Sequence, residues 1–238
     1  MDCNICFKKI LTNNLTCGNG HYYHYECFVG INNKKCIIEM NKQRCILCFQ
    51  YITFCFDDVL SEDECNDIIK KSDDIGFIDI DTMSNSFTDK DAKNKSCIII
   101  DDNVFDLLKE KTKYLYNTKK LQLYDNLKFI KYEEGEFSIK HIDNKHCNSL
   151  YTIIIFLNET DGGDLRIHNK NNHYDFSSKT GRVVIFHKDL FHEVLPVLNS
   201  ISYRIKTDII SKKYRYSPIT NYSNVPIKKR LNRKTWYN

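Results

Sequence analysis

Four closely spaced pairs of cysteine and histidine occupy the first 48 residues of this chain of 238 residues, and seven of its 11 cysteines lie there. The spacings are Cys-x2-Cys, Cys-x3-His, His-x2-Cys and Cys-x2-Cys. The members of these pairs are Cys3, Cys6, Cys17, His21, His24, Cys27, Cys45 and Cys48. Eight such ligands are enough for two tetrahedral zinc sites. A segment of about 50 residues cannot build a sufficient apolar core alone, so metal binding would supply much of its folding energy.

The order and spacing of these pairs resembles a RING finger of the two-histidine type. The resemblance implies that the first and third pairs bind one zinc ion and that the second and fourth pairs bind another. On this chain, the resemblance implies a first zinc site of Cys3, Cys6, His24 and Cys27. It implies a second site of Cys17, His21, Cys45 and Cys48. All eight ligands match. Cys36 is left over and is expected to pack as a small apolar residue.

The usual role of RING fingers implies a ubiquitin-conjugating enzyme as partner. Ile5, Ile46 and Leu47 are the apolar candidates for that contact. RING ligases commonly have proline after the seventh ligand, whereas this chain has Ile46. A zinc-stapled module that serves only folding or protein contact therefore stays an alternative.

The overall composition excludes several other classes of protein. The chain is 42% hydrophobic and 28% charged, which is ordinary for a soluble globular protein, and 11 Gly and Pro residues exclude a collagen-like chain. No apolar run approaches the roughly 20 residues of a membrane span, and the N-terminus lacks the layout of a signal peptide. We expect an intracellular protein, cytoplasmic or nuclear, without a membrane partner. In that setting crowded Cys and His favour metal binding over disulfides. The abundance of Asn and Lys suits AT-rich coding, as in a large DNA virus or a protist.

The chain divides into three zones. Residues 1–50 form the Cys/His-rich zone, residues 52–211 are expected to form one folded domain, and residues 212–238 form a tail with eight Lys or Arg and no acidic residue. Aromatic residues alternate with the basic ones in this tail, a mixture that could bind nucleic acid. A disordered solubilising or targeting segment is the alternative.

Within the middle zone, helices are expected first and strands afterwards. Ser61 and Glu64 form a capping box that predicts a helix ending near Gly76. Apolar spacing predicts a second helix over residues 104–115. Short β-rich runs follow at 127–132, 151–157, 164–168, 182–187 and 202–210, after a first strand at 52–59. This order predicts an α+β domain whose catalytic half is a barrel or a double-sheet jelly roll.

A second set of metal ligands lies in the strand-rich part. His141 and Asp143 are two residues apart, so on a strand both side chains would point to one face. A distant histidine on another strand would complete a set of two histidines and one carboxylate. This set suits Fe(II) and leaves positions for a co-substrate and O₂. The histidines at 146, 168, 173 and 187 lack this spacing, and His146 is a minor alternative ligand.

The middle zone resembles the iron(II)/2-oxoglutarate oxygenases, specifically the prolyl 4-hydroxylase-like branch. Motifs at 56–65, 94–102, 157–167 and 181–186 occur in that family's order, and the likeness covers about residues 52–211. It implies a double-stranded β-helix (jelly-roll, cupin-like) core with flanking helices. It also implies iron binding by His141, Asp143 and His192, with 2-oxoglutarate and O₂ as co-substrates and ascorbate as a further candidate cofactor. The implied reaction is hydroxylation of a protein side chain, with proline the first guess.

The distal carboxylate of 2-oxoglutarate needs a cationic partner, ideally a bidentate arginine. The family places Lys or Arg about ten residues after the distal histidine, but position 202 is serine here. Ser202, Arg204 and Lys206 share one strand face. Arg204 is the favoured partner and Lys206 the runner-up. Tyr132 matches a tyrosine that often borders the co-substrate pocket, and a core aromatic is its alternative role.

Two further functions stay open at this point. One is a RING-type ubiquitin ligase or adaptor whose oxygenase-like domain serves as a binding platform. The other is an oxygenase directed at nucleic acid through the basic tail.

Overall fold

The computed structural model describes residues 1–4, 7–10, 14–17, 21–24, 27, 51–79, 95–99, 102–116, 120–125, 127–143, 149–169 and 172–212. Several predictions fall on residues outside this part of the chain and stay predictions. They concern Ile5, Cys6, Cys36, Cys45, Ile46, Leu47, Cys48, His146 and the tail after residue 212.

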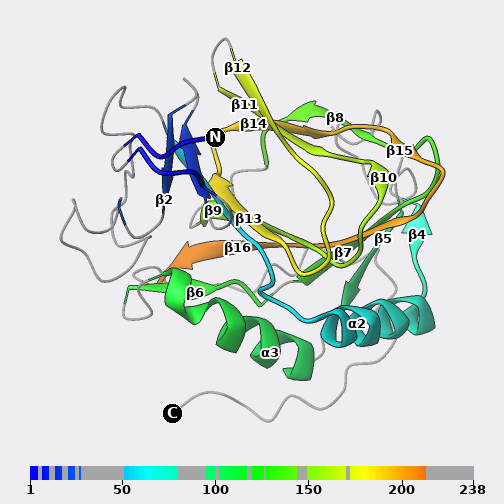
Figure 1. The fold of residues 1–238 in the computed structure, drawn as a ribbon. Coiled ribbons are helices and arrows are strands. Elements are labelled where there is room, and N and C mark those ends of the chain that lie inside the picture. The colour runs from blue at the N-terminus through cyan, green and yellow to red at the C-terminus, as the bar shows by residue number, and fades with distance from the viewer. Residues whose placement is uncertain are drawn as a thin grey trace.

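Two antiparallel sheets face each other in the folded part (Figure 1). The main sheet has the order β2-β1-β3-β13-β9-β16-β7-β5-β4, and β6 also pairs with β16. Its strands are β1 (Asn14–Cys17), β2 (Tyr22–His24), β3 (Ile52–Phe56), β4 (Ile78–Asp79), β5 (Lys95–Ile99), β6 (Leu121–Leu123), β7 (Leu127–Tyr132), β9 (Ser149–Phe156), β13 (Val183–His187) and β16 (Ser202–Ser211). The described residues thus form a mostly β core with few helices, consistent with the predicted jelly roll.

The second sheet is smaller and has the order β12-β11-β14-β8. Its strands are β8 (Ser138–His141), β11 (Leu165–Asn169), β12 (Asn172–Phe176) and β14 (Phe191–Val194). A short pair, β10 (Asp161–Gly162) with β15 (Val197–Leu198), joins the two layers at one end.

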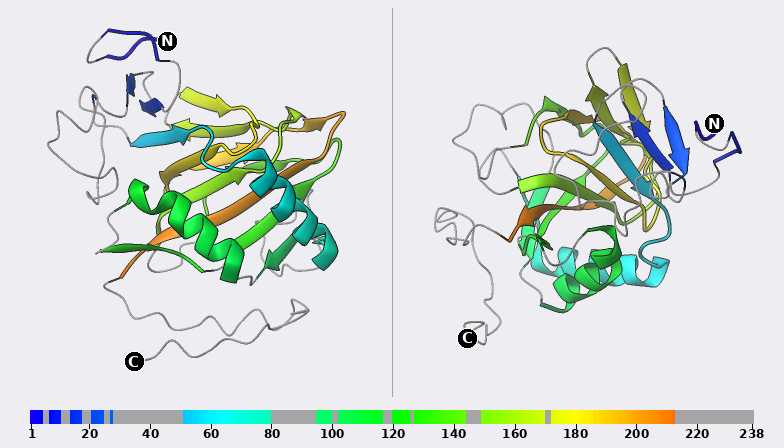
Figure 2. Two further views of the ribbon diagram at one scale, coloured as in Figure 1. Left: turned by 60° about the horizontal axis from the view of Figure 1, so that its bottom comes forward. Right: turned by 90° about the vertical axis from the view of Figure 1, so that its left-hand side faces the viewer.

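Helices α2 (Glu62–Ile75) and α3 (Asp102–Thr112) cover the other face of the main sheet (Figure 2). A 3₁₀ turn, η2 (Lys113–Leu115), follows α3. The capping box is present: Ser61 Oγ accepts from the Glu64 amide at 3.2 Å, and the Glu64 carboxylate accepts from the Ser61 amide at 2.8 Å. Gly76 ends α2 with φ +85°, a conformation that glycine adopts at little cost.

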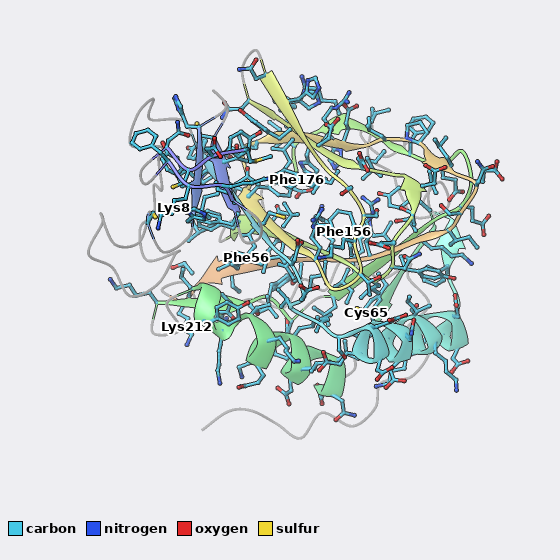
Figure 3. All side chains as sticks on the ribbon, in the orientation of Figure 1. Lys8, Phe56, Cys65, Phe156, Phe176 and Lys212 are labelled. Carbon is cyan, nitrogen blue, oxygen red and sulfur yellow. The ribbon has the colours of Figure 1, made fainter. Side chains whose placement is uncertain are left out.

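The central strands are buried on both faces, which explains their nearly continuous apolar sequences. On β13, Val183 and Ile185 pack toward the helices, whereas Val184 and Phe186 belong to the core between the two sheets. Phe156 and Phe176, from β9 and β12, lie in this second core, in the space between the layers (Figure 3). The alternation places every second residue of these strands in the interior that the smaller sheet closes.

The described part of the N-terminal zone continues the main sheet. Strand β1 pairs with β3 in the register Leu15↔Phe54, and the other edge of β3 pairs with β13. Leu15 and Tyr23 are fully buried in the helix-side core. Tyr51 stacks on His187 with ring centroids 3.9 Å apart, at the end of β13. The hairpin β1–β2 is therefore joined to the larger domain through a shared strand.

Most elements lie close to where the sequence predicts them. The helix at 62–75, the helix beginning at 102 and the strand at 127–132 agree with the expected ranges within a few residues. Strand β12 and the N-terminal hairpin carry polar or Cys/His-rich sequences, and the strand pattern does not predict them. Among the helices of the described ranges, none has the length and apolar character needed to cross a membrane.

Replacing Leu15 with alanine tests whether the hairpin and the barrel unfold together. The side chain is fully buried in the common core, so we expect a loss of about 2–5 kcal/mol in the free energy of unfolding. Chemical denaturation followed by fluorescence should show a single shifted transition. Leu198→Ala is the matched control, because Leu198 is half exposed and its removal should shift the midpoint little. A separate early transition, with the main one unchanged, would contradict the shared core.

Candidate active site

Three predicted iron ligands meet on the inner face of the smaller sheet. His141 ends β8, and His192 on β14 lies directly opposite it in the sheet register. Asp143 follows β8 by two residues, so it lies just past the strand on which the sequence analysis placed it. The ligand atoms of the three side chains all lie within 4.8 Å of one another. Asp143 Oδ1 is 3.7 Å from His141 Nε2 and 3.5 Å from His192 Nε2.

Backbone carbonyls hold both imidazoles with one nitrogen turned inward. The Nδ1 atom of His141 is 2.7 Å from the Ile139 carbonyl, and that of His192 is 3.2 Å from the Leu190 carbonyl. A carbonyl can only accept, so Nδ1 carries the proton and the Nε2 lone pair faces the centre. Burial lowers the pKa of His141 to about 4, and the electrostatic effect of the neighbouring His192 acts in the same direction. The imidazole is therefore neutral near pH 7, as a metal ligand must be.

The carboxylate of Asp143 has a fixed orientation. Thr152 on β9 donates its hydroxyl to Oδ2 at 2.7 Å, and Lys206 on β16 donates to Oδ1. Burial alone would raise the pKa of this carboxyl, but the charge of Lys206, followed by that of His192, holds it well below the usual range. Thr152 is a site residue that the motifs did not reveal. Its only signal was a hydroxyl within an otherwise apolar strand.

Arg204 lies deeper, on the same face of β16 as Lys206. Its side chain is buried between the rings of Tyr132 and Phe156, with the guanidinium carbon 5.2 and 4.7 Å from their centroids. It donates to Ser202 Oγ at 3.1 Å, to Ser178 Oγ at 3.2 Å and to the Gly163 carbonyl. All three acceptors are neutral.

One guanidinium nitrogen of Arg204, Nη1, has no hydrogen-bond partner among the described residues. Burial lowers the pKa of Arg204 to about 10, so the group still carries its charge at neutral pH. A buried cation with a free donor and only neutral acceptors is poorly compensated. It is suited to receive a carboxylate.

Of the predicted co-substrate residues, Tyr132 lies opposite Ser202 on the neighbouring strand and is almost fully buried. Burial raises the pKa of its phenol, which therefore stays protonated. Tyr132, Arg204 and Lys206 thus all lie in the interior between the two sheets, but their contacts differ. Arg204 contacts Tyr132, whereas Lys206 pairs with the carboxylate of Asp143.

At the N-terminus, five of the eight predicted zinc ligands can be placed, and they lie in two groups. Cys3, His24 and Cys27 bring their ligand atoms within 4.8 Å of one another, which unites three members of the first predicted site. Cys17 Sγ lies 3.4 Å from His21 Nδ1, which joins two members of the second. The fourth ligand of the first site and two ligands of the second lie outside the described residues.

The remaining described histidines have other partners. His168 Nε2 is 2.8 Å from a carboxylate oxygen of Glu193 on the outer face of the smaller sheet, and its ring is 6.0 Å from that of His173. His187 stacks on Tyr51. These contacts agree with the expectation that none of the three belongs to the iron site.

Comparison with protein families identifies the β-rich part of the chain. Residues 127–208 match the 2OG-Fe(II) oxygenase superfamily, and this stretch contains the whole His-Asp-His group and both interior cations. A 2OG-Fe(II) oxygenase domain is therefore present here. No curated protein sequence matches the chain significantly.

Solved structures with a similar fold include several prolyl hydroxylases. A viral collagen prolyl hydroxylase from Paramecium bursaria Chlorella virus-1, in its 2OG complex, aligns with a TM-score of 0.55 and 19% identity over 66% of this chain and 94% of that one. A prolyl-4-hydroxylase from Pseudomonas putida aligns with a TM-score of 0.55 and 16% identity, over 66% of this chain and 92% of that one. A Trichoplax adhaerens prolyl hydroxylase bound to a hypoxia inducible factor peptide aligns with a TM-score of 0.56 and 16% identity. The alignment covers 68% of this chain and 84% of that one. At these identities the likeness concerns the fold.

Removing the Thr152 hydroxyl should weaken metal binding at the His-Asp-His group. The Thr152→Val substitution keeps the shape but leaves Asp143 Oδ2 without its donor, so we expect roughly tenfold lower affinity for Mn²⁺. Electron paramagnetic resonance detects free Mn²⁺, so the loss of this signal during a titration measures the affinity. Thr207→Val is the control, because Thr207 donates to the Tyr124 carbonyl away from the ligands. Equal affinities for the two variants would show that Thr152 does not support Asp143.

Proposed function

We propose that this protein is an iron(II)- and 2-oxoglutarate-dependent oxygenase that hydroxylates a side chain of a protein, with proline the first candidate. The observation that carries the proposal is the meeting of His141, Asp143 and His192 within one small group of ligand atoms. Two imidazoles and one carboxylate on one face are the ligand set that Fe(II) oxygenases use. The donor set fits the metal that the oxygenase superfamily implies.

The three ligands would hold the iron from one side, and the metal would supply activation of O₂ when bound. The backbone carbonyls of Ile139 and Leu190 orient the imidazoles, and Thr152 orients the carboxylate. Phe186 packs beside His192, with ring centroids 4.8 Å apart, and narrows the space available to water. These contacts keep the ligands in one geometry and limit side reactions with water.

Arg204 is the proposed partner of the distal carboxylate of 2-oxoglutarate. Arg204 is buried, and among the described residues its Nη1 donor has no partner and no carboxylate pairs with it; these features support this role over a structural one. A carboxylate received there would form charge-assisted hydrogen bonds in a water-poor interior, where they are strong. Tyr132 packs on the guanidinium and would border the same co-substrate. Lys206 is the weaker candidate because Asp143 already engages its ammonium.

A protein substrate is supported by the likeness to prolyl hydroxylase folds. One of these similar structures holds a peptide fragment of hypoxia inducible factor. The support is a shared fold, and the atom that is hydroxylated is proposed on that basis alone.

The N-terminal zone is proposed as a zinc-binding RING-like module. The support is the convergence of Cys3, His24 and Cys27, a mixed thiolate and imidazole set that favours zinc over iron. Ubiquitin transfer depends on Ile5, Ile46 and Leu47, which lie outside the described residues, so it stays a prediction. The same holds for nucleic-acid binding by the basic tail.

An anaerobic titration with Fe(II) and 2-oxoglutarate tests the proposed activity. We expect a visible metal-to-ligand charge-transfer band in the wild-type protein and none in His141→Ala, which lacks one ligand. In Arg204→Met the band should need about 10- to 100-fold more 2-oxoglutarate, because charge-assisted hydrogen bonds are lost.

Arg166→Met is the matched control for the arginine substitution. Arg166 forms an ion pair with Asp175 on the outer face, at 2.7 Å, and its loss should leave the titration unchanged. A folded wild-type protein without a band, or a band that persists in His141→Ala, would refute the proposed metal centre.

The zinc content of purified protein tests the N-terminal proposal. We expect Cys3→Ala to lose about one zinc ion per chain by mass spectrometry, because a tetrahedral site would lose a thiolate. Cys65→Ala is the control: Cys65 lies on the buried face of α2, and burial raises the pKa of its thiol to about 11. Equal zinc contents in the two variants would exclude a zinc site at Cys3.

A further inference from the structure

We propose that Lys206 competes with the metal ion for Asp143 and thereby limits the affinity of the site for divalent metal. This proposal rests on the proposed function, because it takes His141, Asp143 and His192 as the metal ligands. It concerns Lys206 as a positioning residue, in a role distinct from binding of the co-substrate.

Lys206 contacts the carboxylate oxygen of Asp143 that faces the two imidazoles. Its ammonium donates to Asp143 Oδ1, the oxygen nearest the Nε2 atoms of His192 and His141 at 3.5 and 3.7 Å. The other oxygen, Oδ2, receives the Thr152 hydroxyl. The ion pair therefore uses the oxygen that would bind a metal held between the two imidazoles.

The charge of Lys206 also opposes a divalent ion at Asp143. Lys206 pairs with Asp143, so an ammonium already neutralises the carboxylate that would bind the metal. Asp143 has only 10% of its side chain exposed, and Lys206 has 25%. A divalent ion bound at Oδ1 would face an ammonium at close range in a setting of low dielectric constant, where like charges repel strongly. Lys206 has to leave Oδ1 when the metal binds.

The place of Lys206 on β16 allows its ammonium to hold Asp143 and also to leave it. Arg204 and Lys206 lie two residues apart on one face, and both point into the interior between the sheets. The lysine has a flexible stem that can swing away, whereas a planar guanidinium is fixed by its several donors. A lysine at this position can therefore hold Asp143 in place before metal binds and release it afterwards.

The test compares Mn²⁺ binding to metal-free wild-type protein, Lys206→Met and Lys206→Arg, at one pH and without 2-oxoglutarate. Mn²⁺ prefers oxygen and nitrogen ligands, so the N-terminal thiolates contribute little. Its free-ion paramagnetic resonance signal reports binding without any turnover. We expect Lys206→Met to bind Mn²⁺ about 10- to 100-fold more tightly, the ratio that follows from removing one charged hydrogen bond. Lys206→Arg keeps a cation on Oδ1, so it should show no gain in affinity over the wild type.

Thermal unfolding of the same proteins supplies the second readout. Without metal, Lys206→Met should melt at a lower temperature than the wild type, because Asp143 stays buried without its cation. With saturating Mn²⁺ its gain in melting temperature should exceed that of the wild type. Lys179→Met is the matched control, because Lys179 pairs with Asp57 at 3.4 Å and with Asp58 at 3.5 Å, outside the His-Asp-His group.

Equal or weaker Mn²⁺ binding by Lys206→Met would overturn the competition and leave the proposed oxygenase function intact. Absence of Mn²⁺ binding by every variant, with the proteins folded, would overturn the metal centre and this proposal together. Should Lys206→Met fail to fold, Lys206→Gln replaces it in the same measurements, with the same expected direction.

Discussion

Strands β9, β13 and β16 bury side chains on both faces, and the remaining architecture follows from that constraint. One face needs the helices α2 and α3, and the other needs a second sheet, because apolar strands exposed on either side would lose the stabilisation of burial. The second sheet closes a buried interior between the two layers. Any polar group that enters this interior has to find a partner there.

The candidate site uses both layers. The smaller sheet contributes His141 and His192, which lie opposite each other on neighbouring strands, and the main sheet contributes Thr152 and Lys206. Neither layer alone holds the carboxylate of Asp143 in position. Integrity of the proposed metal centre is therefore linked to packing between the sheets, and the N-terminal hairpin joins this packing through β3.

Arg204 and Lys206 show how one strand can carry two cations with different environments. They share a face and are separated by a single residue, yet Lys206 pairs with a carboxylate and Arg204 contacts only neutral acceptors. The cause is depth in the interior: Lys206 lies beside the metal ligands, and Arg204 lies between two aromatic rings. A buried guanidinium with a free donor supports the binding of an anion, and a paired ammonium supports control of Asp143.

Much of this could be predicted from the local sequence. The capping box of α2, the apolar strands and the spacing of His141 and Asp143 depend on neighbouring residues, which the sequence displays directly. The polar strand β12 and the hairpin β1–β2 could not be predicted in this way. Their strand conformation depends on pairing with partners distant in the chain, such as β11 and β3.

The amino-acid sequence by itself determined the type of chemistry: a set of histidine and carboxylate ligands in a β-rich domain and a cysteine-rich zone before it. Only the tertiary structure decided which groups the two interior cations contact, because Arg204 and Lys206 are equivalent by strand alternation. Their roles separate through contacts across the two sheets, with Asp143, Thr152 and the aromatic rings. Contacts between residues so far apart in the chain depend on sheet order and register, which no local pattern encodes.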